Sequence, residues 1–300
     1  MDMTQNKCCR HGESLRRRRR RCRKILRSII FSCSIIAVAV FVAVGSRMIR
    51  SGDGRTNKYD VEAGNNTYDN AVIENSKISE KNKIQNNQSM LDDIMNSTQY
   101  PKQLKDLALK NEEVLEFVYD YPAEHVKKHT IDLTEEASMD SVPLFVQWDK
   151  RWGYEKYSGN FFAASGCGPT TLSMVVVYLT HNREASPIAV AKYSKEAGYS
   201  VDGSGSSWTL ISEGCMHYGV KAKTVALDES RMKAELDEGH PIVVNVGPGD
   251  FTDTGHFMVI TGYDDEGFSI NDPNSIEKSG KRWLFRNISS QIRAVWSMYV

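Results

Sequence analysis

One cysteine in this sequence stands where a thiol becomes reactive. Cys167 lies in segment 165–171, with the sequence SGCGPTT, directly before the apolar run 172–179. Proline is favoured at the first position of a helix, so this pattern predicts the thiol at a helix N-terminus. Unpaired N–H groups and the helix dipole favour a thiolate there and lower the cysteine pKa below its usual value of about 8.5. Cys167 is therefore a candidate nucleophile, and its flanking glycines are expected to leave room for a substrate backbone.

Two downstream residues favour catalysis over the alternative of a merely buried cysteine. His256 stands at the entrance of a predicted strand, 257–263, and Asp272 follows a second predicted strand, 268–271. The glycine-containing turn between these strands is typical of a hairpin. A thiol and an imidazole oriented by a third polar group form the general arrangement for acyl transfer to a cysteine. The order Cys, His, Asp therefore predicts a thiol mechanism.

The predicted hairpin leaves a geometric gap between the histidine and the aspartate. With a three-residue turn at 265–267, His256 and Asp272 share one face of the sheet but stand four residues apart along the strands. At about 3.3 Å per residue this separation is about 13 Å, too far for a hydrogen bond. A β-bulge or a bent entry into the first strand is needed to close it.

A glutamine upstream could complete the site. Gln147 lies in segment 142–153, with the sequence VPLFVQWDKRWG. Its side-chain N–H groups could join the backbone N–H of Cys167 in an oxyanion hole, where negative charge builds on the attacked carbonyl oxygen. An isolated glutamine of this kind is otherwise expected on the surface of an edge strand.

These segments together resemble the bacteriocin-processing peptidase family, which cuts double-glycine leader peptides, and most closely its stand-alone papain-like relatives. The resemblance covers residues 142–300 and includes the Gly-Cys-Gly-Pro-Thr block, Gly-His-Phe, and Asn-Asp-Pro sixteen residues later. It implies a papain-like cysteine peptidase fold with N-terminal helices on an antiparallel sheet. It also implies that Cys167 is the nucleophile, His256 the general base, Asp272 its orienting group and Gln147 an oxyanion donor.

The sequence departs from the best-known members of that family, which form the front of ATP-driven exporters. It has no Walker-type phosphate loop and only one candidate membrane span, so leader-peptide processing is not expected. The chain also lacks paired Cys or His residues at ligand spacing, so we expect neither a metal nor another cofactor. Outside the N-terminal region the only cysteines are Cys167 and Cys215. A disulfide between them would inactivate the nucleophile, whereas Cys215 packed on a helix would not.

Residues 142–300 also predict an α+β fold from their own pattern, with helices first and strands after. The predicted helices cover 170–179, 187–196 and 208–218, and the predicted strands cover 222–226, 241–247, 257–263, 268–271 and 294–299. The glycine-rich loop 247–250 precedes His256 and is a candidate wall of the substrate cleft.

The N-terminal region predicts where the protein works. Residues 28–46 carry no charge and would extend about 28 Å as a helix, enough to span a bilayer. Residues 1–27 contain eleven Lys and Arg against two acidic residues, so the positive-inside rule keeps this tail in the cytoplasm. We favour an uncleaved signal-anchor, although the small-x-small sequence at 43–45 leaves cleavage and secretion open.

The sequence therefore divides into five parts. A basic cytoplasmic tail, 1–27, and a transmembrane signal-anchor, 28–46, precede a flexible polar stalk, 47–99. A helical segment, 100–140, with apolar residues at helical spacing, leads into the peptidase domain, 141–300.

The chain has 38 basic and 38 acidic residues, so without the tail 38 − 11 = 27 basic and 38 − 2 = 36 acidic residues remain. This exported part is acidic, and nucleic acid is not an expected partner.

Three functions fit these observations. The first is a membrane-anchored or secreted cysteine peptidase that hydrolyses a peptide or protein substrate outside the cytoplasmic membrane. The second is an amidase or transpeptidase that uses the same residues on cell-wall peptide and passes the acyl group to an amine. The third is a peptide-binding domain without turnover, against which the presence of His256 argues.

Overall fold

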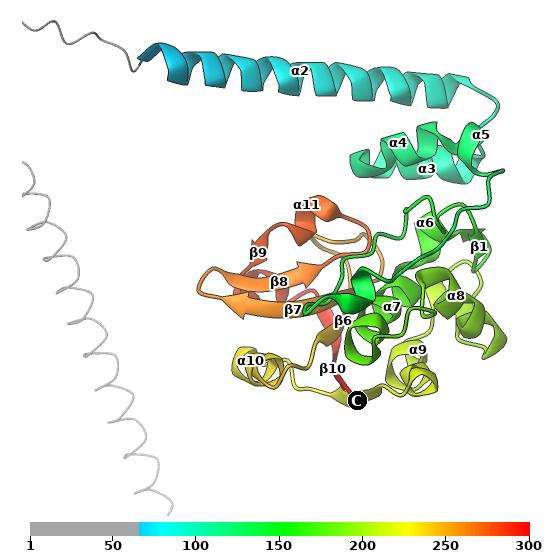
Figure 1. Cartoon of the computed structure of the whole chain (residues 1–300), viewed down its shortest axis with the longest axis vertical. Helices are drawn as coiled ribbons and strands as arrows, with labels where there is room; N and C mark the ends of the chain where they lie inside the picture. The colour runs from blue at the N-terminus through cyan, green and yellow to red at the C-terminus, as the bar shows by residue number, and fades with distance from the viewer. Residues whose placement is uncertain (1–65) are drawn as a thin grey trace, which may run out of the picture. The chain divides into compact units, whose positions relative to one another are not determined.

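The computed structural model describes residues 66–300, with side chains from residue 80 onward (Figure 1). The predicted cytoplasmic tail, the predicted span 28–46 and the first part of the predicted stalk lie outside these residues. Within the described part, no helix combines the length and apolar character needed to cross a membrane.

The predicted stalk differs from the structure over its second half. Residues expected to be irregular form a 31-residue helix, α2 (Asn66–Asn96). The segment contains no glycine or proline, so nothing in it interrupts a helix. Its last turns also carry an apolar stripe, Met90, Leu91 and Ile94, that packs against the next helices. Burial of this stripe accounts for order that the polar composition does not predict.

Within the predicted helical segment 100–140, residues 102–124 are mostly helical. The segment contains α3 (Lys102–Lys110), the 3₁₀ turn η1 (Glu112–Val114), α4 (Leu115–Tyr119) and α5 (Tyr121–Glu124). Its apolar side chains form a separate core, together with the end of α2 and with Phe161 and Ala163 from the peptidase domain. The side chains of this segment in the core are Leu104, Ala108, Val114, Leu115, Phe117 and Val118. A second 3₁₀ turn, η2 (Glu136–Ser138), follows.

A six-stranded antiparallel sheet forms the centre of the remaining chain (Figure 1). Its order is β5-β10-β6-β7-β8-β9, so the C-terminal strand lies between two earlier ones. The bounds are β5 (Lys221–Thr224), β6 (Ile242–Val246), β7 (His256–Asp264), β8 (Gly267–Asn271), β9 (Arg282–Trp283) and β10 (Ile292–Tyr299). All five predicted strands are present. Two short ladders, β1 (Lys156–Tyr157) with β2 (Asn160–Phe161) and β3 (Ser200–Val201) with β4 (Gly205–Ser206), lie outside this sheet.

The helices after residue 160 largely match the predicted ones. They are α6 (Phe162–Ser165), α7 (Cys167–Thr180), α8 (Pro187–Glu196), α9 (Thr209–Ser212), η3 (Gly214–Tyr218), α10 (Glu229–Asp237), α11 (Ile276–Ser279) and α12 (Phe285–Ile288). The predicted helix 208–218 is in fact two short pieces, α9 and η3, that meet near Gly214. The predicted α+β class is confirmed.

Each face of the sheet has its own apolar core. Val243 and Val259 pack on one face with the buried side chains of α7. Val244 and Ile260, which alternate with them along β6 and β7, pack on the other face with Met232 of α10. Helix α7 is thereby fixed against β7, the strand that begins at His256.

Candidate active site

The predicted nucleophile is the first residue of helix α7. Gly166 is the N-cap, and Cys167 is half-buried. The sequence predicts Pro169 as the first residue of the helix, but Pro169 is the third. The helix therefore begins two residues earlier than predicted, at the cysteine itself. As the first helical residue, Cys167 keeps a backbone N–H that no carbonyl of its own helix accepts.

The glycines beside Cys167 do not leave room for a substrate, contrary to the sequence-based expectation. A Cβ atom at Gly166 would lie 2.6 Å from the ring of Phe162, and one at Gly168 would lie 2.6 Å from Ser206 Oγ. Both positions are filled by the protein itself. Glycine is required because β4 and α6 approach the start of α7 closely.

The hairpin of β7 and β8 closes the gap between histidine and aspartate. Asp264 pairs with Gly267, so the turn has two residues instead of three, and the register shifts again by one at Thr261. Either shift alone would turn the two side chains to opposite faces of the sheet. Together they keep one face and shorten the offset by two residues, or about 7 Å. The predicted requirement for a bulge is confirmed.

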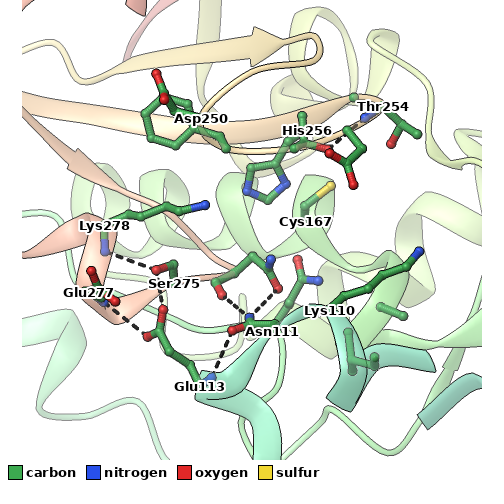
Figure 2. A pocket seen from close by; sticks show the side chains of 18 of the residues that line it. Lys110, Asn111, Glu113, Cys167, Asp250, Thr254, His256, Ser275, Glu277 and Lys278 are labelled. Atoms are coloured by element: carbon green, nitrogen blue, oxygen red, sulfur yellow. Dashed lines mark hydrogen bonds between the residues drawn. The ribbon is translucent and has the colours of Figure 1, made fainter. Parts of the chain in front are cut away.

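His256 and Asp272 consequently form a buried hydrogen bond. The distance from His256 Nε2 to Asp272 Oδ1 is 2.7 Å, and the two residues are 6% and 0% exposed. Because a carboxylate only accepts, Nε2 carries the proton and Nδ1 remains for the thiol. Figure 2 shows the Cys167 sulfur beside the imidazole ring. The structure thus brings Cys167, His256 and Asp272 together.

The electrostatics of this cluster favour an ion pair. Burial opposes ionisation of Cys167, but the hydrogen bond and charge of His256 lower the pKa of the thiol overall. Burial likewise opposes protonation of His256, and the carboxylate of Asp272 outweighs it and raises the imidazole pKa. The two opposite shifts therefore favour a thiolate beside an imidazolium.

Gln147 lines the same cavity as Cys167 and is 4% exposed. Its Nε2 donates one hydrogen bond to Ala163 O at 2.7 Å, which fixes the orientation of the amide. Its Oε1 is buried without a partner among the described residues. An amide nitrogen carries two hydrogens, so one N–H is already used and one is left.

Two cavities meet at Cys167. One, of about 520 Å³, includes Gln147 and His256 in its wall, and the other, of about 640 Å³, includes Ser206 and Trp208. The glycine-rich loop 247–250 contributes to both, as expected from its place before His256. Cys167 therefore contributes to the walls of both cavities.

Sequence reasoning missed one wall of this site. The cavity that contains His256 is also lined by Leu107 and Lys110 of α3, by Glu113 of η1 and by Asn111 between these elements. Figure 2 shows Lys110, Asn111 and Glu113 on this side of the cavity. Their helical spacing predicts a packed segment but not the element against which it packs. No local signal in residues 102–114 connects them with the cysteine.

The other cysteine of the described chain is not part of the site. Cys215 and Cys167 are both free thiols, so the two do not form the inactivating disulfide. Cys215 is fully buried, and burial raises its pKa to about 11. Within residues 66–300 no group of three or more His, Cys, Asp or Glu side chains could hold a metal ion.

Residues 139–300 match the model of the Peptidase C39-like family, and the chain belongs to that family. This match confirms the resemblance to bacteriocin-processing peptidases. Among solved structures, the chain is similar to the peptidase domain of Streptococcus ComA, a bifunctional ABC transporter involved in a quorum sensing pathway. The identity is 19% over 45% of this chain and 90% of that one, with a TM-score of 0.36. A putative C39-like peptidase from Bacillus anthracis is 17% identical over 53% of this chain and 95% of that one, with a TM-score of 0.33. No curated protein matches the chain.

Proposed function

We propose that this protein is a papain-like cysteine peptidase that hydrolyses peptide bonds through Cys167, His256 and Asp272. The observation that carries the proposal is the buried Asp272–His256 hydrogen bond beside a thiol whose pKa is lowered. A purely structural cysteine needs neither an imidazole nor a carboxylate, and burying both without a function costs stability.

In this mechanism the thiolate of Cys167 attacks the carbonyl carbon of the scissile peptide bond. The proton on His256 Nδ1 passes to the departing amine, and an acyl-enzyme thioester remains. The neutral imidazole then takes a proton from water, whose oxygen attacks the thioester. The acid is released, and the thiolate and the imidazolium are restored. Asp272 accepts the hydrogen bond from Nε2 throughout and fixes the ring.

The negative charge of the tetrahedral intermediate needs donors. The backbone N–H of Cys167 and the second N–H of Gln147 Nε2 are the two that we assign to this oxyanion. The bond from Gln147 to Ala163 O supports the assignment because it holds the amide in one orientation. An amide held in one orientation would not need to rearrange when substrate binds.

We also propose that the peptidase domain works outside the cytoplasmic membrane. The support is the uncharged segment 28–46 behind a strongly basic tail, a pattern typical of a single-pass signal-anchor. Peptides or proteins are the substrates that we infer, and the membrane is the partner of the N-terminal segment.

Alkylation of the full chain tests this function. The purified protein would be treated with iodoacetamide between pH 5 and 10, and mass spectrometry would report which cysteine is modified. We expect Cys167 to react below pH 7 and to lose this reactivity in His256→Ala, while Cys215 stays unmodified in the folded protein. Cys215 is the internal control.

A peptide library then tests turnover. Cleavage products that appear with the wild type and not with Cys167→Ala establish a peptidase, and products joined to an added amine establish acyl transfer instead. A Cys167 that reacts no faster than an ordinary thiol at pH 6 contradicts the mechanism and favours a peptide-binding domain.

A further inference from the structure

The loop that follows Asp272 is attached to the helical segment that precedes the family-matched part of the chain. This loop, counted together with the first two residues of α11, spans residues 273–277. The attachment comes from η1 and its N-cap, more than 150 residues earlier in the chain. Residues 139–300 match the family model, so η1 is an addition to the family domain. An addition that contacts the catalytic loop can act on the chemistry.

Glu113 makes the main attachment. Its carboxylate accepts hydrogen bonds from Ser275 Oγ and from the backbone N–H of Glu277 at 3.1 Å (Figure 2). It also accepts one from the backbone N–H of Ile276 at 2.7 Å. The two N–H groups belong to the first turn of α11 and would otherwise lack acceptors. One carboxylate therefore holds three consecutive residues of the loop.

Asn111 makes a second attachment to the same loop. Its Nδ2 donates to the backbone oxygen of Asn274 at 2.9 Å, while its Oδ1 accepts from Glu113 N at 3.0 Å. Asn111 therefore fixes η1 and the loop at once. Trp148 Nε1 also donates to Asn274 O, at 3.3 Å, from within the family domain.

The loop in turn holds the carboxylate of Asp272. Asn274 N donates to Asp272 Oδ1 at 2.8 Å, the same oxygen that accepts from His256, and Asp272 N donates to Ser279 Oγ at 2.9 Å. Asp272 lies one residue beyond the end of β8, so the regular strand ladder does not fix it. The second oxygen, Oδ2, is buried without a partner among the described residues. The position of the carboxylate therefore depends on the loop.

We propose that Glu113 and Asn111 are positioning residues that act through loop 273–277 to hold the Asp272 carboxylate against His256. The helical segment is then a functional part of the peptidase and not only a brace. This inference rests on the proposed thiol mechanism. Release of the loop would weaken the contact between Asp272 and His256, and the imidazolium would lose part of its stabilisation.

The pH dependence of Cys167 alkylation in the full chain tests this proposal. We expect Glu113→Ala to move the midpoint of the alkylation curve up by about one pH unit, so labelling at pH 6 falls about tenfold. Glu112→Ala is the matched control because it removes an equal charge from the same cavity wall, while the Glu112 carboxylate bonds to Asn87 and not to the loop. The control should leave the midpoint unchanged.

Two further variants separate positioning from folding. Glu113→Gln keeps one acceptor oxygen for the α11 N–H groups and should give a midpoint between those of the wild type and Glu113→Ala. Asn111→Ala should move the midpoint in the same direction as Glu113→Ala. If Glu113→Ala does not fold, Glu113→Gln and Asn111→Ala decide the outcome.

A midpoint that stays at the wild-type value in the folded variants, even with a lower melting temperature, overturns the proposal. That result leaves the proposed function intact as long as the wild type reacts at low pH and His256→Ala does not. A wild type without low-pH reactivity contradicts the proposed function itself, so the two failures are distinguishable.

Discussion

The chemistry of the site depends on the protonation states of the Cys167 thiol and the His256 imidazole. Cys167 has a lowered pKa because of His256, and His256 has a raised pKa because of Asp272. The thiolate exists above the first pKa and the imidazolium below the second, so the reactive pair is populated between them. Asp272 widens this pH range because it stabilises the imidazolium through Nε2, the ring nitrogen that does not face the thiol.

Replacement of Asp272 by asparagine should narrow this pH range from both sides. The side-chain amide would still accept a hydrogen bond but would carry no charge, so the pKa of His256 falls and that of Cys167 rises toward its ordinary value. We expect Asp272→Asn to show a higher alkylation midpoint than the wild type, measured with iodoacetamide and mass spectrometry. An unchanged midpoint would show that hydrogen bonding, and not charge, sets the thiol pKa.

Gln147 should affect turnover without affecting the ion pair. An oxyanion forms during attack on a peptide carbonyl but not during alkylation by iodoacetamide. Gln147→Ala should therefore lower kcat on a cleaved peptide by about 10²–10³-fold, a loss typical of one oxyanion donor. The alkylation curve of Cys167 should keep its wild-type midpoint in this variant. Equal losses in both measurements would instead indicate that Gln147 supports the fold of the site.

At the level of elements, the site depends on close contacts that only small residues allow. Gly168 lets β4 approach the first turn of α7, because a Cβ atom there would lie 2.8 Å from Ser206 Cβ. Ser206 Oγ in turn forms a hydrogen bond with Tyr157 OH at 2.7 Å. The N-terminus of α7 is thus fixed from the side of β4, independently of its contact with β7.

We expect Gly168→Ala to destabilise the protein by about 1–3 kcal/mol, a typical cost of overpacking. Denaturant unfolding would measure the change. Ser206→Gly removes the atoms that the new methyl group meets, so the double variant should be more stable than the sum of the two single changes predicts. If the changes in unfolding free energy are strictly additive, the new methyl group does not press on Ser206.

The hairpin of β7 and β8 is the second element-scale feature that decides the chemistry. Its short turn and the register shift at Thr261 each displace the pairing by one residue. Only their sum brings Asp272 to the face and the position at which it reaches His256. The irregularity is therefore a functional feature of the strand pair.

For the whole molecule, the two ends of the chain have different expected roles. The segment 28–46 is predicted to anchor the chain, while residues 139–300 form the family domain. Between them, α3 and η1 pack with the end of α2 and line the active-site cavity. The helices that precede the family domain thus contribute to the site as well as to the connection along the chain.

Deletion of residues 28–46 should release the protein from membranes. Fractionation of cells that express the full chain should place it with the membranes, and protease added to spheroplasts should remove the peptidase domain. The deletion variant should remain in the soluble fraction and resist external protease. A full chain that is soluble before any cleavage would contradict the signal-anchor prediction.

The sequence by itself determined the local features of this protein. The apolar run after Cys167, the apolar runs of β6 and β7 and the turn before Phe268 predict elements because each depends on neighbouring residues. The candidate roles of Cys167, His256, Asp272 and Gln147 likewise follow from short motifs, which carry residue type and order without distance.

Only the tertiary structure decided how these residues meet. The offset between His256 and Asp272 depends on a register shift at Thr261. The neighbouring Gly262 is a residue type that often marks a bulge, but the register on either side of it reflects the fit of two strands. The helical order of α2 and the attachment of Glu113 to the loop after Asp272 depend on residues far away in the chain. Contacts at such separations are set by packing of complete elements, and local patterns carry no record of them.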